Sequence, residues 1–282
     1  MKRKALPIVW SRFQIVKWLI IIVNFSCSSV ALSIEVVVGG SGADLGTFKL
    51  LATAYEKINP DIKIKILPSL GSGGGIKAVK KDKIDICLIS RKVKEKEESD
   101  DILFKHYAQT PLVFISNKNQ AIKNITAEEV LQIYAGKKEK WSSGKTIKPV
   151  VRPENDSDIM VLKENMPGFS DIVKVIYKRR ELPMALTDYD AINIVQEVDG
   201  SFGVSTLSII KSENFDVNVF NLDKISPTFE NIHSKQYNLY KDLYYCHKIK
   251  NKNRGVDEFL KFVFSNEGRE ILQQTGHAVL IN

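Results

Sequence analysis

Short apolar runs alternate with helical patterns along the first third of the chain. Residues 34–38 form a β-branched run, residues 62–66 alternate isoleucine with charged residues, and residues 84–89 are again mostly apolar, so we expect three strands. Between these strands, apolar residues recur at helical spacing over 45–58 and 76–82. Strands that alternate with helices indicate a parallel sheet, and such sheets bind ligands beyond the carboxyl ends of their strands.

The rest of the chain repeats the order of strand, polar loop and helix. Thr126 and Glu129 form a capping box and Gly136 is a stop signal, so a helix is predicted over 127–135. Thr187 is expected to cap a further helix. The other predicted elements are strands at 112–115, 147–151, 202–205 and 239–246, and helices that begin at 159 and span 256–264 and 267–274.

Residues 1–33 have the three-part pattern of a secretory signal. A basic segment is followed by an apolar run over 18–23 and then by small residues. The run is shorter than the roughly 20 residues that span a bilayer, so we expect cleavage after Ala31 or after Ser33 and a periplasmic or secreted protein. An uncleaved membrane anchor is the alternative, and a lipid anchor at Cys27 is disfavoured because Asn and Phe are poor residues before a lipidated cysteine.

The composition is that of a globular protein with room for two domains: 282 residues, 44% hydrophobic and 26% charged. The formal charge of +8 would favour a nucleic-acid partner if it were spread over the chain. Five basic residues and no acidic residue precede Ser33, however, and the remainder carries 36 basic and 33 acidic residues. We therefore expect no nucleic-acid partner.

Two cysteines, Cys87 and Cys246, follow the predicted signal. They could pair in an oxidising compartment, or they could be buried thiols, because Cys87 lies in a predicted buried strand. The four histidines lack metal-ligand spacing, and neither CxxC nor HExxH occurs. No metal or other cofactor is expected.

Three loops that follow strands carry the candidate binding chemistry. The glycine-rich segments 39–44 and 71–75 each lead into a helix, whose free N–H groups and dipole favour an anion. Ser90 and Arg91 add a hydroxyl and a guanidinium at the end of the third strand, and both groups suit an oxyanion. Dinucleotide and P-loop fingerprints are incomplete and no G-x-S-x-G occurs, so a binding protein is favoured over an enzyme.

Segments 40–44, 70–78 and 85–91, in this order and spacing, resemble the phosphate-binding proteins of ABC importers. The resemblance implies a type II periplasmic binding fold, an α/β fold in which two lobes, each a mainly parallel sheet flanked by helices, close on a solute. It implies that residues 34–111 plus 239–282 form lobe one and residues 112–238 form lobe two. The resemblance continues through residues 110–113, 125–141, 150–152, 200–203 and 259–277.

The same resemblance implies a set of ligand-binding residues in four loops. Asp44 stands where the family has a hydroxyl, and acids follow Arg152 where the family has Ser-Gly-Thr. Asp156 and Asp158 are interpreted either as caps of the next helix or as carboxylates that point into the cleft. The implied ligand-binding residues are Ala43, Asp44, Ser72, Gly73, Ser90, Arg91, Arg152, Ser157 and Asp158.

These expectations describe an exported solute-binding protein that is not an enzyme. It captures phosphate or a similar small oxyanion, needs no cofactor, works as a monomer and presents its ligand to an ABC permease in the inner membrane. The alternatives are a protein of the same fold for another oxyanion, a polyol or an amine, a sensor, and a secreted phosphate-ester hydrolase.

Overall fold

The structure is a computed structural model that describes residues 33–120 and 122–280. The predicted signal peptide therefore lies outside the described residues, apart from Ser33. The residues from Ile34 onward form one compact unit. Within the described part of the chain, no helix combines the length and the apolar character required to cross a membrane.

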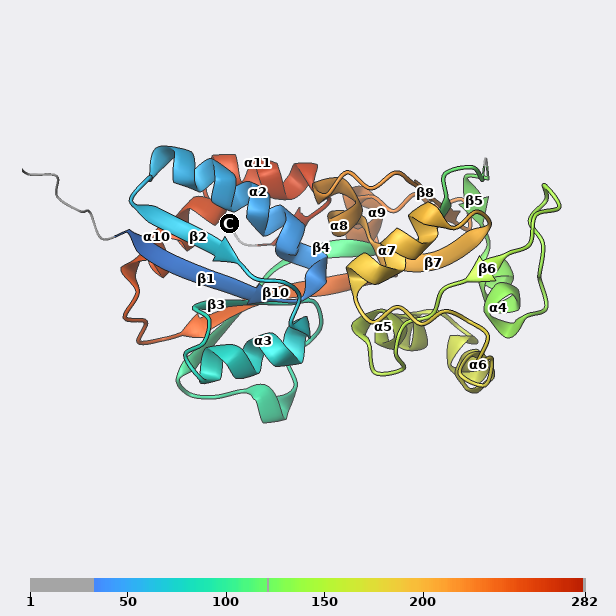
Figure 1. Ribbon diagram of the computed structural model, residues 1–282, viewed down its shortest axis with the longest axis horizontal. Coiled ribbons are helices and arrows are strands. Elements are labelled where there is room, and N and C mark those ends of the chain that lie inside the picture. Colours follow the sequence, from blue (N-terminus) through green and yellow to red (C-terminus); the bar gives the residue numbers. More distant parts are fainter. Residues whose placement is uncertain (1–32, 121, 281–282) are drawn as a thin grey trace, which may run out of the picture. The chain divides into compact units, whose positions relative to one another are not determined.

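The first lobe is built on a sheet whose strands follow the order β2, β1, β3, β10 and β4 (Figure 1). β1 pairs parallel with β2 and β3, as the sequence predicts, whereas β10 pairs antiparallel with β3 and with β4. A short strand, β11, pairs antiparallel with β4. These strands are β1 (Ile34–Gly40), β2 (Ile62–Ile66), β3 (Ile86–Ile89), β4 (Ile102–Asn117), β10 (Tyr240–Lys248) and β11 (Ala278–Val279).

Helices cover both faces of this sheet (Figure 1). One face buries the apolar sides of α2, α10 and α11 in a core that includes Phe48, Tyr107 and Phe259. The other face packs against α3 through Ile76 and Val79. The helical elements of this lobe are α2 (Gly42–Ile58), α3 (Gly71–Lys80), a 3-10 turn η1 (Glu95–Glu97), α10 (Arg254–Val263) and α11 (Asn266–Gln274).

The second lobe continues the same sheet with different partners. The C-terminal part of β4, from Leu112 to Asn117, pairs antiparallel with β7 and β8, and β7 pairs parallel with β6. β5 and β9 form a separate parallel pair. The bounds are β5 (Asn124–Ile125), β6 (Lys148–Pro149), β7 (Ser201–Thr206), β8 (Val217–Val219) and β9 (Asn221–Leu222).

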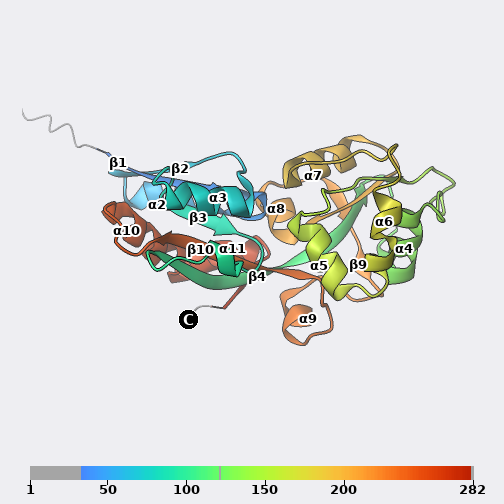
Figure 2. The ribbon, with the colours of Figure 1, turned by 90° about the horizontal axis from the view of Figure 1, so that it is seen from below.

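Helices also cover both faces in the second lobe, as Figure 2 shows from below. α4, α5 and α6 enclose a core that contains Tyr134, Phe169 and Phe202. α7 and α8 enclose a smaller core around Ile192 and Ile209. The helices are α4 (Ala127–Ala135), α5 (Ser157–Asn165), α6 (Phe169–Ile176), α7 (Asp188–Glu197), α8 (Leu207–Ser212) and α9 (Phe229–His233). The prediction of an α/β protein with two lobes is confirmed.

The glycine-rich segment 71–75 is the start of α3 itself, and not a loop that precedes the helix as the sequence predicts. A Cβ atom on Gly75 would lie 2.5 Å from Cys87 Sγ and 2.8 Å from Gly40 Cα. Glycine therefore lets the first turns of the helix lie directly against the carboxyl ends of β1 and β3.

Cys87 and Cys246 face each other across β3 and β10. Both are buried and both are free thiols in the structure. Burial, together with the neighbouring Cys246 thiol, raises the pKa of Cys87 well above its ordinary value.

Candidate functional site

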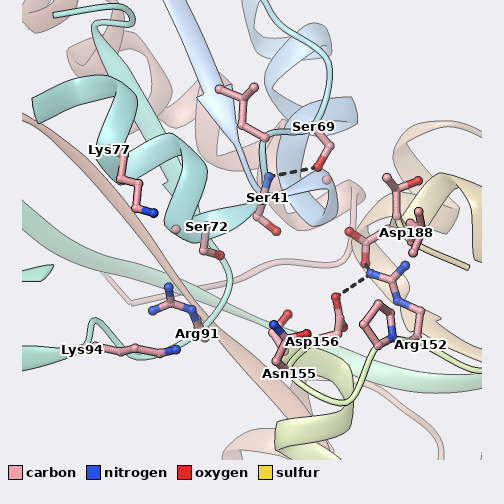
Figure 3. Close-up of a pocket in the computed structure, with 18 of the residues that line it drawn as sticks. Ser41, Ser69, Ser72, Lys77, Arg91, Lys94, Arg152, Asn155, Asp156 and Asp188 are labelled. Atoms are coloured by element: carbon pink, nitrogen blue, oxygen red, sulfur yellow. Dashed lines mark hydrogen bonds and ion pairs between the residues drawn. The ribbon is translucent and has the colours of Figure 1, made fainter. Parts of the chain in front are cut away.

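A pocket of about 550 Å³ lies between the two lobes and is lined by the loops that follow β1, β2 and β3. Figure 3 shows the first-lobe side chains Ser72, Lys77, Arg91 and Lys94 opposite Arg152, Asn155, Asp156 and Asp188 of the second lobe. The convergence of the post-strand loops follows from the parallel pairing of their strands.

Three serines connect the loops on the first-lobe side. Ser41 Oγ lies 2.7 Å from Ser90 Oγ, and the Ser90 N–H donates to Ser72 Oγ at 3.2 Å. Ser41 and Ser90 are both buried, and Ser41 and Ser72 line the pocket. The hydroxyl of Ser72 is thus positioned by the third strand's loop at the first turn of α3.

The first-lobe wall is cationic. Lys77, Lys94, Lys96 and Arg91 line it together with one acid, Glu97. Arg91 donates two hydrogen bonds of 2.8 Å to the Glu97 carboxylate and lowers the pKa of that group. The N-cap residue of α3, Leu70, forms no side-chain cap, and Ser69 Oγ accepts the N–H of Gly71 at 3.4 Å. The other N–H groups of the first turn and the helix dipole add to the positive potential of this wall.

The second-lobe wall is built around Arg152, which is 3% exposed. Its Nη1 donates to the Ala185 carbonyl at 3.0 Å and its Nη2 donates to Asp156 Oδ2 at 2.8 Å. Its Nε lies 3.4 Å from Asp158 Oδ2, and its Nη2 lies 3.6 Å from Asp188 Oδ1. Three carboxylates therefore surround one guanidinium.

Lys241 brings a second buried cation to the same place. It comes from β10, forms an ion pair with Asp158 and donates to Ser157 Oγ at 3.0 Å. We call the five groups of Arg152, Lys241, Asp156, Asp158 and Asp188 the buried charge cluster. Burial and repulsion by Asp158 raise the pKa of Asp156 to about 6.

Asp156 lines the pocket, whereas Asp158 is buried behind it. Asp156 is the N-cap of α5 and accepts the Asp158 N–H at 2.9 Å, which agrees with the capping interpretation. The Asp158 carboxylate, which is 1% exposed, faces Arg152 and Lys241.

The pocket brings together five of the nine residues that the sequence resemblance implies: Ser72, Gly73, Arg91, Arg152 and Ser157. The other four are fully or almost fully buried and do not line it: Ala43, Asp44, Ser90 and Asp158.

Asp44 and Ala43 make contacts elsewhere in the interior. Asp44 Oδ1 lies 3.3 Å from His277 Nε2, and the Ala43 carbonyl accepts the Ser208 hydroxyl of α8.

Sequence reasoning missed the lysines of the first-lobe wall and two members of the buried charge cluster. Lys77 could have been predicted from the sequence, because it lies four residues after Gly73 on the helix that begins at the glycine-rich segment. Asp188 has the sequence context of an ordinary first-turn helix acid, and Lys241 lies in a strand. Neither position carries a local signal of the tertiary contact that it makes.

Comparisons with known proteins agree with this architecture. The family model described as a PBP superfamily domain matches residues 28–267. The phosphate-binding protein PstS of Borreliella burgdorferi is 23% identical over 264 residues, which are 89% of this chain and 92% of the relative. PstS of Staphylococcus saprophyticus is 27% identical over 258 residues, which are 83% of this chain and 77% of the relative.

Solved structures show the same fold. A putative phosphate ABC transporter substrate-binding protein with bound phosphate from Clostridium perfringens superposes with a TM-score of 0.74 at 22% identity, over 88% of this chain and 100% of the other. An ABC-type phosphate transport receptor from Vibrio cholerae gives a TM-score of 0.59 at 20% identity, over 86% of this chain and 99% of the other. By the family model, which covers most of its length, this chain belongs to the PBP superfamily.

Proposed function

We propose that this chain is the solute-binding protein of an ABC importer and that it captures phosphate, or a similar small oxyanion, in the pocket between the lobes. The observation that carries the proposal is the first-lobe wall, where four cationic side chains and the first turn of α3 face the pocket. The relatives named as phosphate-binding proteins support the same ligand class.

The anion binds first to the wall of lobe one. Ser72 donates its hydroxyl, Gly73 donates its N–H from the first turn of α3, and Lys77 and Lys94 supply charge. Arg152 and Ser157 approach from lobe two, so that binding favours closure.

We place the lobe boundary between Pro111 and Leu112. Pro111 of β4 pairs with Tyr240 of β10, and Leu112 pairs with Thr206 of β7, so the strand changes partners at this point. Lobe one then comprises residues 34–111 and 239–282, and lobe two comprises residues 112–238.

The proposal extends to the protein's place in the cell. Removal of residues 1–33 releases an exported protein that binds its ligand without turning it over, works as a monomer and hands the ligand to a membrane permease. The names of the relatives and structural neighbours support the transport role.

Titration calorimetry of the purified protein with phosphate, with sulfate as a second ligand, tests the proposal. Phosphate should bind, and Lys77→Gln should weaken it at least about fivefold, because it removes a cation from the wall. Lys57→Gln is the matched control, since Lys57 is exposed in the last turn of α2 and does not line the pocket. Wild-type protein that gives no heat with any small oxyanion would reject the proposal.

A further inference from the structure

We propose that the carboxylate of Asp188 is a built-in anion, which occupies the space beside Arg152 in the unliganded protein and is displaced by the incoming oxyanion. This inference rests on the proposed function and assigns a role in setting the affinity to a residue outside the sequence motifs.

The position of Asp188 joins the two lobes. It is the first residue of α7 in the second lobe, and its Oδ1 lies 3.6 Å from Arg152 Nη2. Its Oδ2 lies against Gly42, the first residue of α2 in the first lobe. A Cβ atom added to Gly42 would be only 2.7 Å from this oxygen. The carboxylate therefore lies beside the positive end of a 17-residue helix and beside a buried guanidinium, two features that attract an oxyanion.

The charges of the cluster favour the displacement of one carboxylate by an incoming anion. Two cations, Arg152 and Lys241, face three carboxylates, and all five groups are largely or completely buried. A dianion that arrived with all three carboxylates in place would add to an excess of negative charge in a medium of low dielectric.

Asp188 is the most weakly held of the three. Asp158 pairs with Lys241, and Asp156 accepts hydrogen bonds from Arg152 and from the start of α5. Asp188 has one ion-pair contact among the described residues, the 3.6 Å approach to Arg152, whereas Asp158 has two cations within 3.4 Å. Asp188 also lines the pocket, so it has space into which it can move.

The displacement is tested by titrating phosphate into Asp188→Asn. Removing the competing charge should tighten phosphate binding at least about tenfold. Glu154→Gln removes the same charge from an exposed position of the same lobe, beside Pro153, and should change the affinity less than about threefold. Asp188→Ser is the second variant if the asparagine variant does not fold.

A ligand-free measurement separates this inference from the proposed function. Spin labels on the exposed positions Lys65 of β2 and Lys174 of α6 report the distance between the lobes. Without phosphate, Asp188→Asn should shift the distribution to longer distances, because the contact from Arg152 to Gly42 through the carboxylate is lost.

Each outcome has one meaning. Weaker or unchanged phosphate binding in Asp188→Asn overturns the displacement, and weaker binding would show that the carboxylate accepts a hydrogen bond from the ligand. If neither protein binds phosphate, the proposed function fails, and the ligand-free distances decide the inference: an unchanged distribution overturns it.

Discussion

Lys241 on β10 and Asp158 in the first turn of α5 form an ion pair in which each side chain is only 1% exposed. β10 begins at the boundary between the lobes, where Tyr240 pairs with Pro111 of β4, and the start of α5 carries part of the second-lobe wall of the pocket. The pair therefore fixes the start of α5 to the connection between the lobes.

Lys241→Met should destabilise the fold by about 3–5 kcal/mol, because it leaves the buried Asp158 carboxylate short of one cation. The free energy of unfolding in urea measures the effect. Lys248→Met on the same strand is the control and should cost less than about 1 kcal/mol, since Lys248 pairs with an exposed carboxylate, Asp82. A loss below about 1 kcal/mol in Lys241→Met would contradict the importance of the pair.

Asp156 should make the wild-type protein more stable in mild acid. The pKa of Asp156 is raised from its ordinary value of 3.8 to about 6, so the folded protein holds the proton more tightly than the unfolded chain. Its contribution to stability is present below about pH 4 and is lost as the pH rises through 6.

The measurement compares unfolding free energies at about pH 4.5 and pH 7. The increase in the free energy of unfolding from pH 7 to about pH 4.5 should be about 2 kcal/mol larger in wild type than in Asp156→Asn, given 1.36 kcal/mol for each pKa unit. Asp171→Asn, at an exposed position in α6, should keep the wild-type difference. Equal pH dependence in wild type and Asp156→Asn would contradict the raised pKa.

Gly75→Ala should cost about 1–3 kcal/mol of stability and weaken phosphate binding, because the new methyl group would push α3 away from β1 and β3. Gly74→Ala is the matched control in the same helix. Its Cβ would meet Leu70 Cβ at 3.4 Å, and alanine favours a helix by about 1 kcal/mol over glycine. Urea unfolding and calorimetry of both variants measure the contrast, and equal stability would refute the close approach.

Cys87 and Cys246 should resist maleimide in the folded protein and react in urea, because both are buried and a raised pKa disfavours the reactive thiolate of Cys87. Peptide mass spectrometry after labelling measures each site. An engineered Lys65→Cys should react at once under native conditions, since Lys65 is exposed. A mass that is lower by two hydrogens for the linked peptides would reveal a disulfide instead.

The elements that the sequence predicts best are those with local signals. The capping box of Thr126 and Glu129 and the left-handed Gly136 both occur, and α4 spans the predicted residues. β4 is much longer than the predicted 112–115, because Lys105 and His106 interrupt the apolar pattern of its half-buried first part. β6 is only two residues long, and its Pro149 has no N–H to extend the pairing.

The site is predictable where it follows from strand order. Parallel strands place their following loops together, and Ser72, Gly73 and Arg91 accordingly share the first-lobe wall. The direction of a buried side chain has no such signal: Asp44 points toward His277 and Asp158 toward Lys241, through contacts between segments far apart in the sequence.

The 16-residue strand β4 belongs to the sheets of both lobes, and β10 runs beside it. The lobes are therefore joined by a hydrogen-bonded ribbon and not by a loose tether. Any change in the angle between the lobes must bend these paired strands, so the elastic resistance to the motion grows with the angle. Little binding free energy is then lost to ordering a connector, since the connector is ordered before the ligand arrives.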